Sequence, residues 1–140
     1  MIAYFDTSAV VPLVVAEAGS ARAAMLWDGA EHAVSVRLVY PEGRAALAHA
    51  QRLGRLTVRQ LRAAVREFEA RYLELDLVEL DHVLARRAGH LAELHGLRGY
   101  DGVHLAAAER VRDADLVVVA GARELFKAAA AEGMATSSLS

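Results

Sequence analysis

Short apolar runs that alternate with longer segments of helical periodicity constrain the fold of this chain most strongly. The runs cover residues 2–5, 32–36 and 116–119, and residues 75–80 alternate apolar residues with acids, which predicts a strand with one wetter face. Runs this short, bounded by polar or turn residues, are typical of strands in a buried parallel sheet. Their alternation with helical segments predicts an α/β sandwich built on a mainly parallel central sheet.

The segments between these runs predict helices. The clearest spans residues 57–72, where Thr57 and Gln60 have capping-box spacing and apolar residues recur at helical intervals. Asp81 is expected to cap another helix. We expect further helices at residues 20–27, 38–53, 82–95, 100–112 and 123–132. A short helix is also expected after the first strand, capped by Thr7 or Ser8 and ending at about residue 17. Residues 134–139 add either an edge strand or a frayed end.

The composition limits the classes of protein to which the chain can belong. Its 140 residues, 55% of them hydrophobic and 24% charged, predict one compact domain spanning residues 1–140. The formal net charge of −2 means that a nucleic-acid partner would have to be held by local arginines or through a metal. The absence of cysteine excludes disulfides, thiolate zinc sites and cysteine nucleophiles.

The amino-terminal segment bears on where the protein works. It lacks a basic stretch and Asp6 interrupts its apolar run, so we expect no signal peptide. The apolar run at residues 9–16 contains a proline and is too short to span a bilayer. We therefore expect a cytoplasmic protein that is not inserted in a membrane, and the lack of cysteine agrees with that location.

Three acids, Asp6, Glu42 and Asp101, each stand at an end of a predicted element. Asp6 follows the first strand, at the edge where open parallel sheets bind ligands. The other two begin helices, where the helix dipole favours a negative charge. Carboxylates gathered at one edge repel one another unless a cation lies between them, and hard oxygen ligands favour Mg²⁺ or Mn²⁺. Such an ion activates water and neutralises phosphate charge, so the acids predict metal-dependent phosphodiester cleavage.

Each acid also has a purely structural interpretation when it is taken alone. Asp6 could simply end a strand, Glu42 could be an ordinary first-turn acid, and Asp101 could be only a helix N-cap. The case for a site rests on the three settings occurring together, in this order and at these spacings.

Three segments resemble the PIN-domain family, and most closely the VapC-like ribonuclease toxins of bacterial type II toxin–antitoxin pairs. They read YFDTSA at residues 4–9, PEGR at residues 41–44 and LRGYDGVHLA at residues 97–106. The third segment is the most specific, and the resemblance extends over nearly the whole chain. It implies a PIN-like three-layer α/β/α sandwich, an Mg²⁺- or Mn²⁺-dependent endoribonuclease, a homodimer, and a cognate antitoxin that blocks the site.

The resemblance also implies roles for individual residues. Asp6, Glu42 and Asp101 would be metal ligands and therefore catalytic. Ser8 would be a nearby hydroxyl that positions a ligand or a water, and its alternative is a helix N-cap.

The chain departs from the family just after the fourth predicted strand, where a fourth acid is expected. Ala122 stands at that position. Asp113 and Asp115 precede the strand and should lie at the opposite end of the sheet, whereas the longer side chain of Glu124 could reach the site. The missing acid leaves a second hypothesis open, which is a catalytically degenerate PIN domain that binds RNA or protein.

One histidine and several arginines are secondary candidates. His104 shares a helix face with Asp101 and could orient a substrate phosphate or a ligand, or be a half-buried helix histidine. Arg98 is the favoured contact for a substrate phosphate or an antitoxin carboxylate. A basic stripe on the helix at residues 57–72 could touch RNA or an acidic antitoxin segment, or be a solvated helix face. The stripe consists of Arg59, Arg62 and Arg66.

A third hypothesis is an unrelated α/β phosphatase that uses Asp6 as its nucleophile. That chemistry requires a second acid two residues later, where the chain has Ser8, and a basic phosphate loop, which does not follow. A trapped aspartyl-phosphate would support it.

Overall fold

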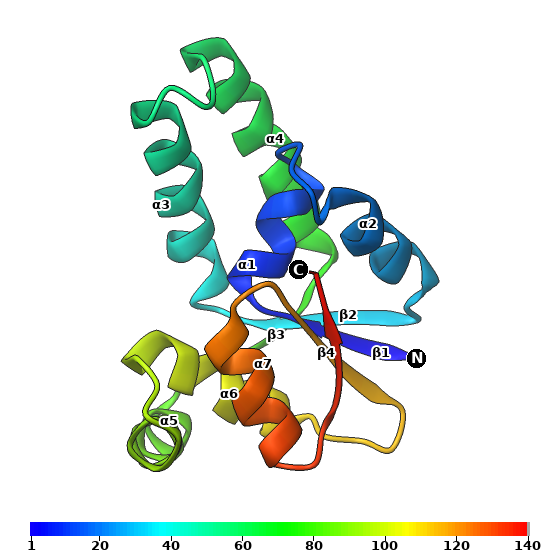
Figure 1. Ribbon diagram of the computed structural model, residues 1–140, viewed down its shortest axis with the longest axis vertical. Helices are drawn as coiled ribbons and strands as arrows, with labels where there is room; N and C mark the ends of the chain where they lie inside the picture. The colour runs from blue at the N-terminus through cyan, green and yellow to red at the C-terminus, as the bar shows by residue number, and fades with distance from the viewer. Residues whose placement is uncertain (140) are drawn as a thin grey trace.

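Five parallel strands form the central sheet, in the order β3-β2-β1-β4-β5 (Figure 1). The strands are β1 (Ile2–Phe5), β2 (His32–Val36), β3 (Asp76–Val78), β4 (Leu116–Ala120) and β5 (Ala135–Ser138). The computed structural model describes residues 1–139. β1 is the central strand, and it pairs in parallel with β2 on one side and with β4 on the other.

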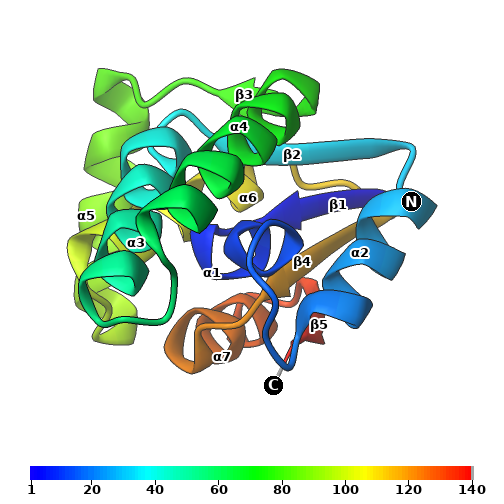
Figure 2. The ribbon, with the colours of Figure 1, turned by 90° about the horizontal axis from the view of Figure 1, so that it is seen from above.

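Helices cover both faces of the sheet, which is the middle of three layers (Figures 1 and 2). One layer consists of α1 (Thr7–Val10), the 3₁₀ helix η1 (Val11–Leu13), α2 (Ser20–Gly29), α3 (Val39–Arg52) and α4 (Val58–Glu74). The other consists of α5 (His82–His95), α6 (Gly99–Arg110) and α7 (Arg123–Ala131). The predicted three-layer α/β/α sandwich is confirmed, with all of the described strand pairs parallel.

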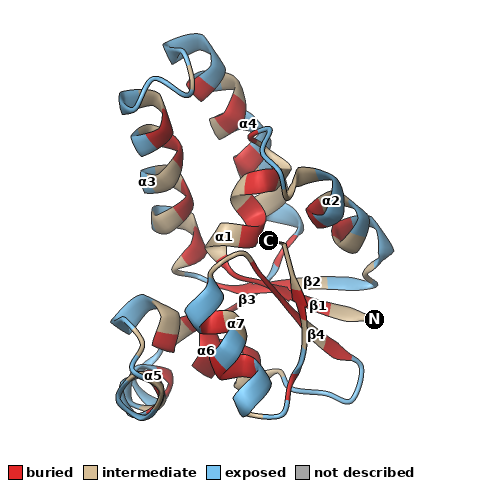
Figure 3. Ribbon diagram, in the orientation of Figure 1, coloured by how far each residue is buried: buried red, intermediate tan, exposed pale blue. Residues whose placement is uncertain are grey.

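The alternation of side chains along β1 supplies a separate core to each face of the sheet. Ala3 and Phe5 pack with the layer of α1–α4, whereas Tyr4 packs with the layer of α5–α7. Buried residues lie along the sheet and on the inner sides of the helices (Figure 3). Small residues bring α6 close to α5, since a Cβ atom on Gly102 would lie 2.6 Å from the carbonyl oxygen of Ala88.

The order of the strands creates a binding position at one edge of the sheet. From β1 the chain proceeds to β2 and β3 on one side, and then returns to β4 and β5 on the other. Where connections leave neighbouring parallel strands in opposite directions, a crevice opens at their carboxyl ends. In this protein the crevice lies beyond β1 and β4, where α1 and α7 begin.

The segment at residues 7–17 is the main error in the predicted elements. Neither Thr7 nor Ser8 caps the first helix; Asp6 does, because its side chain accepts the backbone N–H of Ala9. The helix gives way to η1 and ends at residue 13, well short of residue 17. Pro12 has no N–H with which to continue the α-helical hydrogen bonds. The third strand is also shorter than predicted, at residues 76–78.

The other local predictions agree with the structure. The capping box of Thr57 and Gln60 is present at the start of α4, and Asp81 caps α5. Residues 135–138 form the edge strand β5, so the strand alternative for this segment is confirmed. Among the helices within residues 1–139, none is both long and apolar enough to cross a membrane.

α3 and α4 form an antiparallel pair that stands above the sheet (Figure 1). Gly43 in the first part of α3 permits their close contact, because a Cβ atom there would lie only 2.2 Å from Cζ of Phe68 on α4. The neighbouring residue Glu42 belongs to the first turn of α3. The packing of α3 against α4 therefore positions the first turn of α3, and with it the Glu42 side chain.

Candidate functional site

A cavity of about 550 Å³ opens at the carboxyl ends of β1 and β4. It brings together six of the residues discussed from the sequence, which come from four different segments of the chain. Asp6, Ser8, Glu42, Asp101, His104 and Ala122 all line it, together with Thr7, Val11, Glu17, Ala45, Ala46 and Tyr100. Arg98 does not contribute to the lining.

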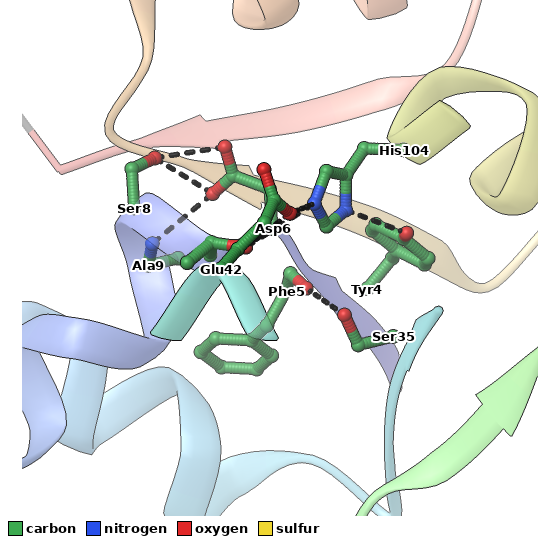
Figure 4. Close-up of polar contacts among 9 residues, drawn as sticks. Tyr4, Phe5, Asp6, Ser8, Ala9, Ser35, Glu42 and His104 are labelled. Atoms are coloured by element: carbon green, nitrogen blue, oxygen red, sulfur yellow. Dashed lines mark hydrogen bonds and ion pairs between the residues drawn. The ribbon is translucent and has the colours of Figure 1, made fainter. Parts of the chain in front are cut away.

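Asp6 is almost completely buried, with 3% of its surface exposed. Its carboxylate accepts the backbone N–H of Ala9 at 3.0 Å and faces the Ser8 hydroxyl at 2.8 Å (Figure 4). Burial raises the pKa of Asp6 from 3.8 to about 6, and the nearby His104 and the Ser8 hydroxyl only partly offset this effect. Among residues 1–139, no lysine or arginine forms an ion pair with this buried carboxylate.

Ser8 connects Asp6 to the end of β4. Its Oγ atom accepts the backbone N–H groups of Gly121 and Ala122, each at 2.9 Å. Because these two donors occupy the lone pairs of the hydroxyl oxygen, its single hydrogen is directed to Asp6. The N-cap interpretation of Ser8 is therefore wrong, since this side chain positions the Asp6 carboxylate instead of capping α1.

Glu42 is held through one of its two carboxylate oxygens. Oε1 accepts the Thr7 hydroxyl at 2.7 Å and lies 2.7 Å from Nε2 of His104. On the other side of the imidazole ring, Nδ1 lies 2.9 Å from the Tyr4 hydroxyl (Figure 4). A continuous set of hydrogen bonds thus joins β1, α6, α3 and the start of α1.

His104 is buried, with 2% of its surface exposed, so the half-buried interpretation is wrong. The close packing of α6 against α5 and the sheet removes this face of α6 from solvent. The edge of the ring meets Tyr4 at a centroid distance of 5.9 Å, and both ring nitrogens have hydrogen-bond partners. This environment favours a role for His104 in orienting a side chain of the site.

Asp101 lies in the first turn of α6, whose N-cap is Arg98, so the N-cap interpretation of Asp101 is wrong. Burial raises the pKa of the Asp101 carboxyl, against the lowering effects of His104 and Arg98, and the charges of Glu42 and Glu124 raise it further. Within residues 1–139 its carboxylate makes no hydrogen bond or ion pair. Of the three predicted acids, Asp101 is therefore the one whose carboxylate is least held in place by other residues.

The donor chemistry of Asp6, Glu42 and Asp101 fits a hard divalent cation such as Mg²⁺ or Mn²⁺. Burial raises the pKa of the Asp6 and Asp101 carboxyls, so a cation bound between them would favour their ionised forms. In the described part of the chain, no three acidic or imidazole side chains already converge closely enough to enclose an ion. Asp6 and Glu42 instead make their hydrogen bonds within the protein.

Several other predicted residues lie outside the cavity. Arg98 donates to the Tyr100 hydroxyl, and its guanidinium lies 5.5 Å from the centre of the Tyr100 ring, so it contacts a lining residue and acts on Asp101 only through its charge. Asp115 lies at the opposite end of the sheet, as predicted, where its carboxylate is 3.2 Å from the amino terminus. Glu124 is exposed and does not line the cavity. The arginines of the basic stripe are exposed on α4 and do not line it either.

Six of the lining residues were not predicted from the sequence as site residues, and three of them, Thr7, Glu17 and Tyr100, have polar groups. Thr7, which bonds Glu42, could have been suspected because it directly follows Asp6 in the YFDTSA segment. Glu17 lines the cavity from the loop after η1 and pairs with Arg55 at 3.0 Å, a position that the incorrect helix assignment concealed. Tyr100 precedes Asp101, but its sequence position gave no sign that the ring would form part of the wall.

Comparisons with known proteins give one family. The PIN domain matches residues 3–131 of this chain. Ribonuclease VapC45 of Mycobacterium tuberculosis is 48% identical over 132 residues, which cover 94% of this chain and 92% of that protein. The crystal structure of PAE2754 from Pyrobaculum aerophilum has a TM-score of 0.71 at 24% identity, covering 97% of this chain and 83% of that chain. A toxin-antitoxin complex from Klebsiella pneumoniae has a TM-score of 0.61 at 17% identity, covering 89% of each chain.

Proposed function

The chain belongs to the PIN-domain family, and from that premise we propose that it is a divalent-metal-dependent endoribonuclease toxin that cleaves RNA phosphodiester bonds. The observation that carries the proposal is the meeting of Asp6, Glu42 and Asp101 in one cavity at the carboxyl ends of β1 and β4. The 48% identity to ribonuclease VapC45 supports RNA as the substrate.

The three acids have a common role in this proposal. Asp6, Glu42 and Asp101 would hold Mg²⁺ or Mn²⁺. When bound, the ion supplies a water of lowered pKa and neutralises charge on a phosphate oxygen. Ser8 keeps the Asp6 carboxylate oriented by donating to it, and the N-terminal end of α6 favours the ionised form of Asp101.

The remaining walls of the cavity suit a nucleic-acid strand. Val11, Ala45 and Ala46 make part of the wall apolar, which limits the access of bulk water to the acids. Tyr100 lines the cavity with 41% of its surface exposed, so its ring is available to stack on a base. Arg98 lies against that ring and would contact a phosphate of the same strand.

Two partners belong to the same proposal. A cognate antitoxin would cover the cavity and block the entry of RNA, and the similarity in fold to a toxin-antitoxin complex from Klebsiella pneumoniae supports this partner. A homodimer is the assembly that the family resemblance implies. Sedimentation analysis of the purified protein, alone and with the product of an adjacent short reading frame, tests both partners.

The experiment that tests the function is cleavage of a total RNA pool by purified, antitoxin-free protein. Discrete fragments are expected with Mn²⁺, none with EDTA, and none from Asp6→Asn or Asp101→Asn. Equal cleavage by the wild type and both variants would show that these carboxylates are not the catalytic groups.

Ala122 supports one alternative function, a degenerate PIN domain that binds RNA or protein without cutting it. The methyl group of Ala122 lines the cavity where a fourth carboxylate is expected. Glu17 also lines the cavity, but its carboxylate is paired with Arg55 at 3.0 Å. This alternative predicts binding of RNA without turnover, and cleavage that appears or increases in Ala122→Asp. Metal-dependent turnover by the native chain, lost in Asp6→Asn, rules it out.

A further inference from the structure

The hydrogen bonds around Glu42 divide the two oxygens of its carboxylate between different tasks. Oε1 receives the Thr7 hydroxyl at 2.7 Å and faces Nε2 of His104 at 2.7 Å. Oε2 accepts no hydrogen bond from residues 1–139. Glu42 lines the cavity, and 20% of its side chain is exposed. One oxygen is thus committed to the protein, and the other is available to a ligand.

The imidazole of His104 is itself fixed in orientation. Since a carboxylate can only accept, Nε2 carries a hydrogen and donates it to Glu42. In the neutral ring the Tyr4 hydroxyl then donates to Nδ1, which lies 2.9 Å away. Tyr4 is completely buried on the central strand, so the ring of His104 is anchored to a strand that is paired on both sides.

We propose that His104 is a positioning residue, which holds the Glu42 carboxylate so that Oε1 is occupied and Oε2 faces the cavity. The proposal rests on the proposed function in that it takes Glu42 as a ligand of the divalent cation. Residues that orient a metal ligand without touching the metal typically change metal affinity by about 10- to 100-fold when they are replaced. His104 lines the cavity with only 2% of its surface exposed, and both of its ring nitrogens have partners within the chain, so the ring is better placed to hold Glu42 than to bind RNA.

Two substitutions of His104 separate this role from a general structural one. The side-chain nitrogen of glutamine is four bonds from Cα, like Nε2 of histidine, so His104→Gln can still donate to Glu42. The nitrogen of asparagine is three bonds from Cα, like Nδ1, so His104→Asn can reach Tyr4 but not Glu42. Both variants are polar, uncharged and smaller than histidine, and they differ in which of the two histidine nitrogens they replace.

The measurement is the affinity for Mn²⁺ alone, by calorimetric titration of metal-free full-length protein. We expect the Mn²⁺ affinity of His104→Gln to remain within about 3-fold of that of the wild type. We expect His104→Asn to bind Mn²⁺ at least about 10-fold more weakly than the wild type. His95 supplies a matched control, because it is also a helical histidine whose Nε2 pairs with a glutamate, Glu132, at 2.9 Å, but it does not line the cavity. His95→Asn should bind Mn²⁺ like the wild type.

A double-mutant cycle shows whether His104 acts through Glu42. In a Glu42→Gln background, His104→Asn should cause no further loss of Mn²⁺ affinity. If His104→Asn does not fold, Thr7→Val tests the same arrangement at a half-buried position by removing the other donor to Oε1, and it should also weaken Mn²⁺ binding.

The outcomes distinguish this inference from the proposed function. If the wild type binds Mn²⁺ and cleaves RNA while His104→Asn and His104→Gln have equal affinities, or Thr7→Val binds like the wild type, the positioning role is wrong and the function stands. If the wild type neither binds Mn²⁺ nor cleaves RNA, both proposals fail.

Discussion

Asp6 links the stability of the protein to the chemistry of its site. Its carboxyl has a pKa of about 6 in the folded chain, against 3.8 for the ordinary group, because it is buried. The folded state therefore holds the proton more tightly than the unfolded state does. The resulting contribution to stability is fully present below about pH 4 and is lost as the pH rises through about 6. The difference between the two pKa values corresponds to roughly 3 kcal/mol in the free energy of unfolding.

Asp6→Asn should stabilise the metal-free protein at pH 8, by up to about 3 kcal/mol, because it removes a buried charge and keeps an oxygen to accept from Ala9 and Ser8. At pH 4 the variant and the wild type should be nearly equal. Urea unfolding in EDTA at the two pH values measures this. Wild-type protein that is the more stable of the two at pH 8 would contradict the account. Added Mn²⁺ should stabilise the wild type and leave the variant unchanged.

Ser8→Ala should destabilise the protein by about 2 kcal/mol, because it leaves the N–H groups of Gly121 and Ala122 without their acceptor and removes one of the donors to the Asp6 carboxylate. Thr57→Ala offers a comparison, since it removes one exposed capping hydrogen bond and should cost about 1 kcal/mol. Thermal unfolding of the two variants gives the ranking. A smaller loss for Ser8→Ala than for Thr57→Ala would mean that the connection to β4 is unimportant.

At the scale of elements, the sequence correctly predicted the helices and strands whose ends are marked by capping or turn residues. β1 and β2 have the predicted bounds, because each is a short buried run with a turn at its end. The first helix was predicted incorrectly, since Asp6, Thr7 and Ser8 are all competent caps and only the tertiary structure selects Asp6. Where several neighbouring residues satisfy the same local rule, contacts from distant segments decide.

The pairing of α3 with α4 makes a prediction about two helical glycines. Gly43→Ala should destabilise the protein by about 1–3 kcal/mol, because the new Cβ would lie 2.2 Å from Cζ of Phe68. Gly89→Ala in α5, where a new Cβ would have no neighbour within 4 Å, should stabilise it by about 0.5–1 kcal/mol. Chemical denaturation of both variants measures the contrast. Equal effects would show that α3 and α4 are not in such close contact.

Over the whole molecule, the strand order explains why residues 6, 42 and 101 meet at all. Their gathering at one edge could be predicted, because the carboxyl ends of parallel strands and the helices that follow them share that edge. The link from Tyr4 through His104 to Glu42 could not be predicted. It depends on which side-chain orientation each residue adopts once α6 is packed against the sheet, and helical spacing relates His104 only to Asp101.

The Mn²⁺ dependence of RNA cleavage tests the central claim most directly. The rate should be zero in EDTA and rise over the Mn²⁺ concentrations at which calorimetry detects binding, because the proposed function assigns binding and cleavage to the same site. Asp101→Asn should show no cleavage at any Mn²⁺ concentration, whereas Asp115→Asn, altered at the opposite end of the sheet, should follow the wild type. Cleavage by the wild type in EDTA, or by Asp101→Asn at the wild-type rate, would contradict a metal-dependent nuclease built on these acids.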